Sequence, residues 1–291
     1  MKISIDDDKI LRAEAENNVD LYNYIQSRIK EKTRNYWKNI RDMDSGDNLK
    51  WYGGIEFDDV MDELLLGNKN QTQEFLSGIK EQFSDDVAYS QIYFDNEGFA
   101  YDMGAVVSGE PECCLNMGAP ESKKFITIGI DYSFPCYVKP DVLRNRGMAI
   151  TNLVHSLITQ GYVVNLRFLQ IYNPHNTRNV TKSIFSLDLN TENLSISTVA
   201  FYCSVEFFRA IMILVHSMLD ELPELPGEGM GSDDKDEFFD IFGEDMLFIP
   251  AGYTDESMRS LTSVEKANKK ILNLFNDWNE KMGAQDVSCD L

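Results

Sequence analysis

The feature that most constrains the fold is a strand–helix–strand unit in the middle of the chain. Residues 123–133 (KKFITIGIDYS) form an apolar, β-rich run typical of a buried strand. Apolar residues then recur at helical spacing over 143–158 and stop at Gly161, before a second β-rich run at 162–172 (YVVNLRFLQIY). Short turns join the three segments, which predicts two parallel strands with a right-handed crossover. The sequence therefore predicts an α/β fold built as three layers around a parallel sheet.

Further segments extend this prediction toward the C-terminus. Residues 181–189 are expected to add a third strand, and residues 246–252 a late one. The apolar stretch 196–219 is expected to form one long buried helix, and 263–282 a final amphipathic helix. Residues 223–240 are rich in proline, glycine and acid, which indicates an exposed acidic loop.

The N-terminal part of the chain is predicted to be mainly helical. We place this region at 1–119, ahead of an α/β domain at 120–291. Over residues 1–45, apolar residues recur at steps of three and four and give one stripe on a charged helix. Residues 58–66 and 71–83 are predicted as two more helices, with a Gly-Asn stop between them.

Composition excludes several classes of function. The 291 residues hold 48 acidic and 27 basic side chains, a formal net charge of −21. Contact with a phosphate backbone needs clustered Lys and Arg, so we expect no direct nucleic-acid binding. The same charge disfavours an anionic membrane surface, and no apolar run reaches the ~18 residues that span a bilayer. The first ten residues lack a signal-peptide pattern, and five cysteines without framework spacing fit reduced thiols, so a cytoplasmic location is expected.

The best candidate site follows the first strand of the central unit. Asp131 and Ser133 stand where that strand ends, and ligands bind at the carboxyl ends of strands in open α/β sheets. Two oxygen-bearing side chains two residues apart can both face a hard cation, which predicts a Mg²⁺ site. The predicted binding residues around it are Tyr132, Arg144 and Arg146, because two arginines can hold an anionic ligand or a partner carboxylate.

Patterns of other enzyme classes are missing from the sequence. The three histidines, His155, His175 and His216, belong to neither an HExxH motif nor a zinc deaminase motif. No phosphate-binding GxxxxGK[ST] loop and no GxSxG elbow occur. We therefore predict no catalytic residue.

The same region carries a family resemblance. ITIGIDYSFP, the glycine-containing helix after it and VVNLRFL resemble the opening of a von Willebrand factor A (VWA)-type domain, over about residues 123–255. That family has an Asp-x-Ser-x-Ser motif at a metal-ion-dependent adhesion site. The resemblance places Asp131 and Ser133 at its first two positions, whereas Pro135 replaces the third hydroxyl. It implies a VWA-like or Rossmann-like fold, with two further residues completing the site: Thr198 and Asp255.

A second resemblance spans more of the chain. WYGGIEFDDV, GEPECCLN and RNRGMAITNLVHSLITQGYVVNL are similar to an uncharacterised group of phage-encoded proteins. This resemblance implies a phage or mobile-element origin and no defined reaction.

Together these observations predict a non-enzymatic interaction or scaffold module. The VWA resemblance implies a protein partner bound through a metal-held acid, such as an AAA+ ATPase or a host enzyme, in the host cytoplasm. Two alternatives stay open. An acidic surface can imitate DNA and inhibit a host nucleic-acid enzyme, or an enzyme can use the site around Asp131, Ser133 and Arg146.

Overall fold

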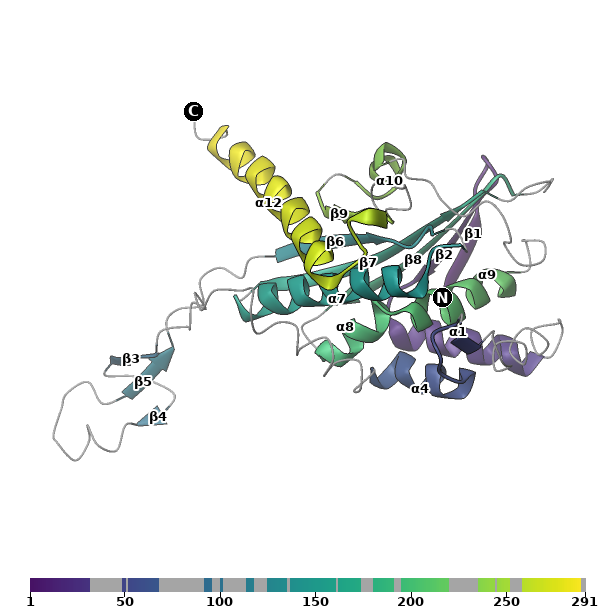
Figure 1. The fold of residues 1–291 in the computed structure, drawn as a ribbon, viewed down its shortest axis with the longest axis horizontal. Coiled ribbons are helices and arrows are strands. Elements are labelled where there is room, and N and C mark those ends of the chain that lie inside the picture. The colour runs from purple at the N-terminus through teal and green to yellow at the C-terminus, as the bar shows by residue number, and fades with distance from the viewer. Residues whose placement is uncertain are drawn as a thin grey trace.

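A six-stranded mixed sheet with helices packed against it forms the body of the protein (Figure 1). The computed structural model describes residues 1–31, 49–50, 52–67, 92–95, 100–101, 114–117, 125–134, 137–160, 162–173, 180–190, 195–219, 235–243, 245–251 and 258–288. The predicted α/β class is confirmed.

The main sheet has the strand order β1-β2-β8-β7-β6-β9. Strands β7, β6 and β9 run parallel, whereas β8 is antiparallel to β7. Strand β2 is parallel to β8, and β1 closes that edge as an antiparallel neighbour of β2. The bounds are β1 Lys2–Ile5, β2 Ile10–Ala15, β6 Phe125–Asp131, β7 Val163–Tyr172, β8 Lys182–Asn190 and β9 Leu247–Ile249. The central prediction of two parallel strands around a crossover helix is therefore confirmed.

The helices and a second sheet complete the described elements. The helices are α1 Asn18–Glu31, α4 Phe57–Leu66, α7 Pro140–Thr159, α8 Ile196–Tyr202, a π-helix η3 Phe207–Met212, α9 Ile213–Met218, α10 Lys235–Phe242 and α12 Val264–Ser288. A small antiparallel sheet has the order β3-β5-β4, from β3 Ile92–Asp95, β4 Ala100–Tyr101 and β5 Cys114–Met117.

The N-terminal stretch differs from the helix predicted there. Residues 2–5 and 10–15 are strands of the main sheet, and the helix starts only at Asn18. Leu11, Ala13 and Ala15 are all buried, which is the two-residue period of a strand with one covered face. The helix predicted for 58–66 is confirmed, and Gly67 ends it with a positive φ of 75°. The helix predicted for 71–83 lies outside the described residues.

Two predictions for the C-terminal half also need correction. The apolar stretch 196–219 is not one helix, because α8 ends at Tyr202 and the π-helix begins at Phe207. The exposed acidic loop predicted for 223–240 is wrong in its last part, since residues 235–242 form α10 and Phe238 is fully buried. Residues 223–234 lie outside the described residues. An apolar pair in that acidic segment, Phe238-Phe239, packs against Phe248 of β9 and so holds the helix on the sheet.

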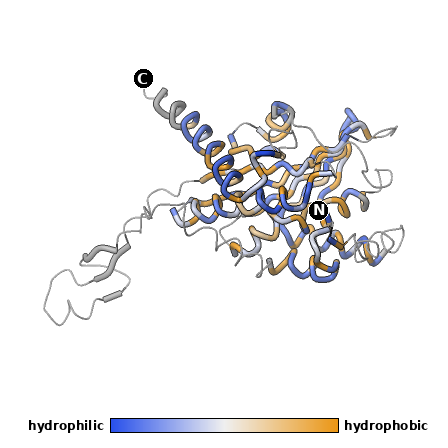
Figure 2. Tube along the Cα trace, in the orientation of Figure 1, coloured by the Kyte–Doolittle hydropathy of each residue, from blue (hydrophilic) through white to orange (hydrophobic). Residues whose placement is uncertain are grey.

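The core lies on both faces of the sheet. Side chains of β6 and β7 such as Ile128, Leu166 and Phe168 join the large cluster with α7, α8 and the π-helix. The alternate residues Leu169 and Ile171 face α10 in a smaller cluster. Figure 2 shows hydrophobic residues along the strands of the main sheet, whereas most of α12 is hydrophilic.

Among the described helices, none alone has the length and apolar composition needed to cross a bilayer. Ile196–Tyr202 and Phe207–His216 meet that test only as a pair, with a bend of 57° between them. Both belong to the buried core of the protein.

Candidate functional site

Asp131 is a buried carboxylate that joins two strand ends. It is the last residue of β6, and its side chain is fully buried. Oδ1 accepts a hydrogen bond from the backbone N–H of Ser133 at 2.7 Å. Oδ2 accepts one from the backbone N–H of Ala251 at 3.1 Å, just after β9. The carboxylate therefore links the carboxyl ends of two neighbouring parallel strands.

Arg146 of α7 binds the same two strand ends through their carbonyl oxygens. Its side chain is 3% exposed. Nη2 donates to the carbonyl oxygens of Asp131 at 2.9 Å, Ile249 at 3.1 Å and Pro250 at 3.1 Å. The guanidinium also lies 4.9 Å from the centre of the Phe134 ring, within cation–π range. One cation thus satisfies three carbonyls and neighbours the Asp131 carboxylate.

Ser133 adds a link to β7. The residue is fully buried, and its Oγ accepts a hydrogen bond from the backbone N–H of Ile171 at 3.0 Å. Its side chain also hydrogen-bonds the Asp131 carboxylate. We call Asp131, Ser133 and Arg146 the strand-end clamp, because together they connect β6, β7, β9 and α7.

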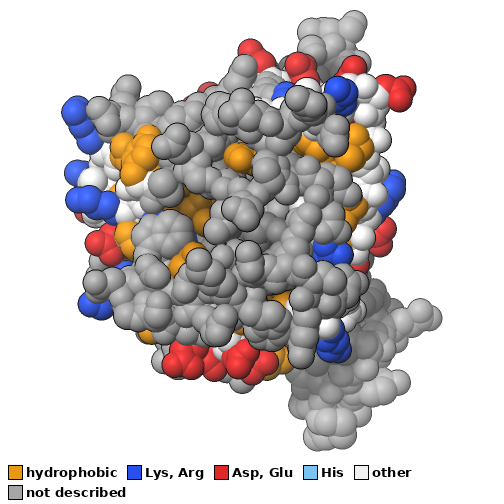
Figure 3. Space-filling view, turned by 90° about the vertical axis from the view of Figure 1, so that its right-hand side faces the viewer, with side chains coloured by type: hydrophobic (Ala, Val, Ile, Leu, Met, Phe, Trp, Pro, Cys, Tyr) orange, Lys and Arg blue, Asp and Glu red, His pale blue; other side chains and the backbone are white. Residues whose placement is uncertain are grey.

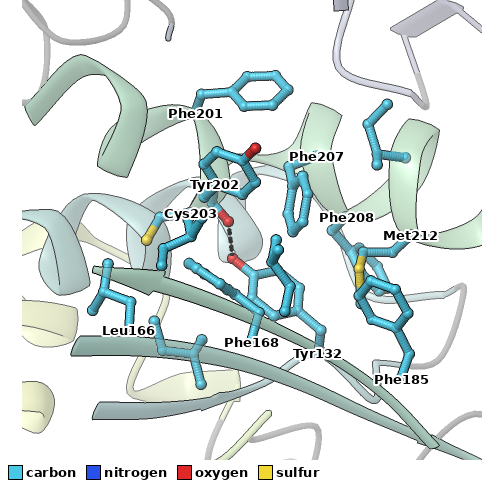
Figure 4. Packing of buried hydrophobic residues seen from close by; sticks show 14 of the residues in the cluster. Tyr132, Leu166, Phe168, Phe185, Phe201, Tyr202, Cys203, Phe207, Phe208 and Met212 are labelled. Atoms are coloured by element: carbon cyan, nitrogen blue, oxygen red, sulfur yellow. Dashed lines mark hydrogen bonds between the residues drawn. The ribbon is translucent and has the colours of Figure 1, made fainter. Parts of the chain in front are cut away.

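The structure places Tyr132 inside the protein and Arg144 on its surface. The Tyr132 hydroxyl donates to the carbonyl of Tyr202 at 2.6 Å, between the aromatic rings of Phe168 and Phe207 (Figure 4). Arg144 forms an exposed ion pair with Asp141 at 3.4 Å. Tyr132 therefore contacts core residues, and only Arg144 of the three predicted binding residues faces solvent.

The electrostatics of the clamp follow from its burial. Desolvation raises the pKa of Asp131 from 3.8 to about 6, while the Ser133 hydrogen bonds and the Arg146 charge oppose this rise.

Among the described residues, no group of three or more His, Cys, Asp or Glu side chains could hold a metal ion. The Mg²⁺ site at Asp131 and Ser133 stays a prediction. Thr198 lies in the first turn of α8, and Pro135 and Asp255 fall outside the described residues.

Sequence reasoning missed a second buried arginine near the site. Arg209 of the π-helix is 1% exposed, and its Nη2 donates to the carbonyl of Val138, just before α7. A π-helix is rare and occurs often at functional sites. The signal was present, since Arg209 interrupts an apolar stretch, and a buried cation requires hydrogen-bond acceptors.

The WYGG segment contacts Glu206, a residue far away in the sequence, and the pattern of residues in the sequence does not predict this contact. Gly53 has a φ of 114°, and a Cβ placed there would lie 2.5 Å from the side chain of Glu206, which is buried beside the π-helix. Glycine is needed here because other residues rarely adopt this φ, and a Cβ would also force the Glu206 side chain to move.

His216 is a second buried titratable group. As the pH falls, we expect it to change the stability of the folded state in the opposite direction to Asp131. It packs against the rings of Tyr172 and Phe185, and burial lowers its pKa from 6.5 to about 4. As the pH falls below 6.5, the unfolded chain protonates this histidine first, so the folded state loses stability down to about pH 4. Asp131 acts in the opposite sense, because its folded pKa of about 6 exceeds its ordinary 3.8 and the folded state binds the proton first.

We expect the two effects, each roughly 3 kcal/mol in full, to nearly cancel between pH 6 and pH 4. Replacing His216 by Leu removes one of them, so the variant should gain stability relative to wild type as the pH falls through this range. The measurement is the free energy of unfolding in urea at several pH values for both proteins. His155→Leu is the matched control: burial also lowers the pKa of His155, but this residue is only half-buried, so its variant should show a smaller gain as the pH falls. A wild-type minus variant difference that does not vary with pH would contradict the assignment.

Comparison with known proteins identifies a family. A family described as "Domain of unknown function (DUF7192)" matches residues 6–279. Searches of curated proteins and of solved structures give no match.

Proposed function

Because the chain belongs to the DUF7192 family, a domain of unknown function, we propose its role from its own geometry. We propose a non-enzymatic protein-binding module whose partner docks at the carboxyl end of β6. The observation that carries this proposal is the loop between β6 and α7, described at residues 132–134 and 137–139. Arg146 holds the Asp131 carbonyl at its start, and Arg209 holds the Val138 carbonyl near its end.

The loop displays a large aromatic side chain between these two fixed points. Tyr137 is 66% exposed, although its neighbour Val138 is buried at 2%. Tyrosine is enriched among residues that contribute most to protein binding, because it buries a large area and loses few rotamers. Fixing the backbone in advance reduces the entropy lost on association. Tyr137 on a loop held by two buried arginines therefore has the properties of an interface anchor.

The strand order supports the same location. Asp131 ends an interior parallel strand, and the crossover helix α7 follows it, as the resemblance to the VWA family requires. We therefore propose a VWA-like arrangement, with the partner at the strand ends and Mg²⁺ bound by Asp131 and Ser133 as the finer hypothesis. An AAA+ ATPase or a host enzyme in a cytoplasm is the kind of partner that this resemblance implies.

Two variants test the docking site, one in the loop after β6 and one at the amino end of β6. Tyr137→Ala should lose a partner that wild type retains, because truncating a central aromatic anchor costs about 2 kcal/mol or more, over tenfold in affinity. Phe125→Ala is the control: Phe125 is 73% exposed at the amino end of β6 and should keep the partner. The measurement is a tagged pull-down from cell lysate at low and high salt, with captured proteins identified by mass spectrometry.

Each outcome separates this proposal from the alternatives. A partner retained at high salt, lost in Tyr137→Ala and kept in Phe125→Ala supports it. Basic nucleic-acid enzymes captured equally by all three proteins, and lost together at high salt, would favour charge mimicry of DNA. Among the described residues, Figure 3 shows both acidic and basic side chains around the rim of one face. Equal losses in both variants would contradict docking at the carboxyl end of β6.

A further inference from the structure

Strand β1 is the outermost strand at one side of the main sheet, and all of its residues are exposed (Figure 1). It pairs with β2 on one side, and among the described strands none pairs with its other side. Ile3 is 37% exposed and Ile5 is 45% exposed, so no helix covers this strand fully. An outer strand with unpaired backbone groups is a template to which another strand can add.

The hydrogen bonds to β2 show which backbone groups of β1 point outward. In an antiparallel pair, directly opposite residues alternate between hydrogen-bonded and non-hydrogen-bonded pairs. The backbone N–H of Asp6 donates to the carbonyl of Ile10 at 3.2 Å, in continuation of the β1–β2 register. Counting back from Asp6, the even-numbered residues of β1 bond to β2. The N–H and C=O groups of Ile3 and Ile5 therefore point to the open edge.

The side chains of Ile3 and Ile5 lie on the apolar face of the sheet. In the register, Ile3 is opposite Ala13 and Ile5 is opposite Leu11. Directly opposite residues of paired strands point to the same face, and both Ala13 and Leu11 are fully buried in the core. The two isoleucines thus extend the core face by one strand, beyond the part that the helices bury.

The order of side chains along this edge is self-complementary. Two copies of KISID (residues 2–6) can pair antiparallel about a twofold axis at the central serine. Each Ile3 then lies opposite an Ile5, and these are the hydrogen-bonded pairs that outward N–H and C=O groups require. Each Lys2 lies opposite an Asp6 on the other face of the sheet, and opposite charges stabilise a cross-strand pair.

The net charge of the chain opposes this pairing without preventing it. Each copy carries −21. At physiological ionic strength the Debye length is about 8 Å, so most acids of the two copies are screened from each other, whereas a cross-strand pair is closer than this distance. Standard stable interfaces use roughly 20–30 residues a side, many more than one short strand supplies. We therefore expect a dimer that dissociates on dilution.

We propose that two copies of the chain associate through their β1 edges, antiparallel about a twofold axis at Ser4, and join their main sheets into one. Backbone hydrogen bonds between Ile3 and Ile5 hold the edges together. The isoleucine side chains bury one another, and Lys2 of each copy faces Asp6 of the second copy. Strands β2, β8 and β7 separate this edge from β6, so the interface is distinct from the loop that carries Tyr137.

Sedimentation velocity of the untagged full-length chain tests the association. From micromolar to millimolar concentration, the sedimentation coefficient should rise from that of a monomer toward that of a dimer. Lys2→Glu places like charges opposite each other at both ends of the pairing and should weaken the dimer at least about tenfold. Lys9→Glu is the matched control, because it makes the same charge change in the turn after β1, outside the pairing. A monomer at every concentration, or equal weakening by both variants, would overturn the proposal.

Disulfide cross-linking tests the register and does not depend on the charge variants. Ser4 lies opposite Ser4 of the second copy in a non-hydrogen-bonded pair, where Cα atoms are about 4.5 Å apart and a disulfide can form. Ser4→Cys should therefore give a disulfide-linked dimer under mild oxidation. Lys2→Cys is the control on the same face of the same strand; the two copies of this position are four residues apart along the strand, about 14 Å, and should not link.

The native cysteines set the background of this experiment. The chain contains five, so wild type is oxidised in parallel, and mass spectrometry of the linked peptides identifies the linkage at position 4. Equal cross-linking of Ser4→Cys and Lys2→Cys would overturn the proposed register. So would the absence of a linkage at position 4 at concentrations where wild type is dimeric, because the dimer would then use another surface.

Discussion

Replacing Gly147 by Ala is expected to destabilise the protein by more than about 3 kcal/mol, although the same change normally stabilises a helix. Gly147 lies within α7, where α7 meets the end of α8. A Cβ at this position would lie 2.0 Å from the carbonyl oxygen of Cys203 and 3.0 Å from its carbonyl carbon. Both are backbone atoms, so relief requires the two helices to separate, and overpacking of this kind costs typically 1–3 kcal/mol and occasionally more.

The expected loss of stability in Gly147→Ala is opposite to the usual effect of this substitution in a helix. In a helix interior Ala is favoured over Gly by about 1 kcal/mol, so a surface position would gain stability. Urea unfolding of Gly147→Ala and wild type gives the difference directly. Gly129→Ala is the matched control, because its Cβ would contact the sulfur and terminal methyl of Met246, which are the flexible end of a side chain. We expect a smaller loss there, and equal losses would contradict the special role of the α7–α8 contact.

Gly147 also shows what the sequence could and could not predict. The helix around it was predictable, because its apolar residues recur over five turns between two β-rich runs. The need for glycine was not, since it arises from Cys203, which is 56 positions away in the chain and directly follows another helix, α8. Contacts between distant elements leave no periodic pattern in one sequence.

The strands at the N-terminus were missed for a different reason. Leu11 and Ala15 are four residues apart, which fits a helix as well as a strand. Only the pairing of β2 with β8, with Ala13↔Phe185 in register, decides between the two. Strand propensity depends strongly on such neighbours, so a short segment with small apolar residues is ambiguous by itself.

The candidate site was predicted in position and not in detail. Asp131 and Ser133 were expected together at a strand end, and the structure places them there. Hydrogen bonds to Ala251 and Ile171 could not be predicted, because the strands that precede or contain these residues become neighbours only through the sheet order. The inward direction of Arg146 was likewise hidden, since Arg144 two residues earlier has the same chemistry and faces solvent.

Arg146→Met should lose roughly 3–5 kcal/mol of stability, whereas Arg144→Met should change it by less than about 0.5 kcal/mol. The Arg146 variant leaves three carbonyl oxygens without their donor and the buried Asp131 carboxylate without its nearest cation. A buried carbonyl left without its donor costs roughly 1–3 kcal/mol, and the buried Asp131 carboxylate also loses the favourable interaction with a nearby positive charge. Arg144 forms only an exposed pair with Asp141, and such pairs contribute little.

The pH dependence of Arg146→Met identifies the cause of its instability. Without the guanidinium, the pKa of Asp131 should rise above its value of about 6, because the Arg146 charge lowers it in the wild type. A folded pKa raised further above the ordinary 3.8 means that the folded state gains stability as the pH falls from about 7 toward 4. The deficit of Arg146→Met relative to wild type should therefore shrink in urea unfolding at pH 5 compared with pH 7. Adding Asp131→Asn should remove this pH dependence, because no buried carboxylate remains to be protonated. A deficit that stays constant between pH 7 and pH 5 would mean that lost carbonyl hydrogen bonds alone account for it, and that Arg146 does not act on Asp131.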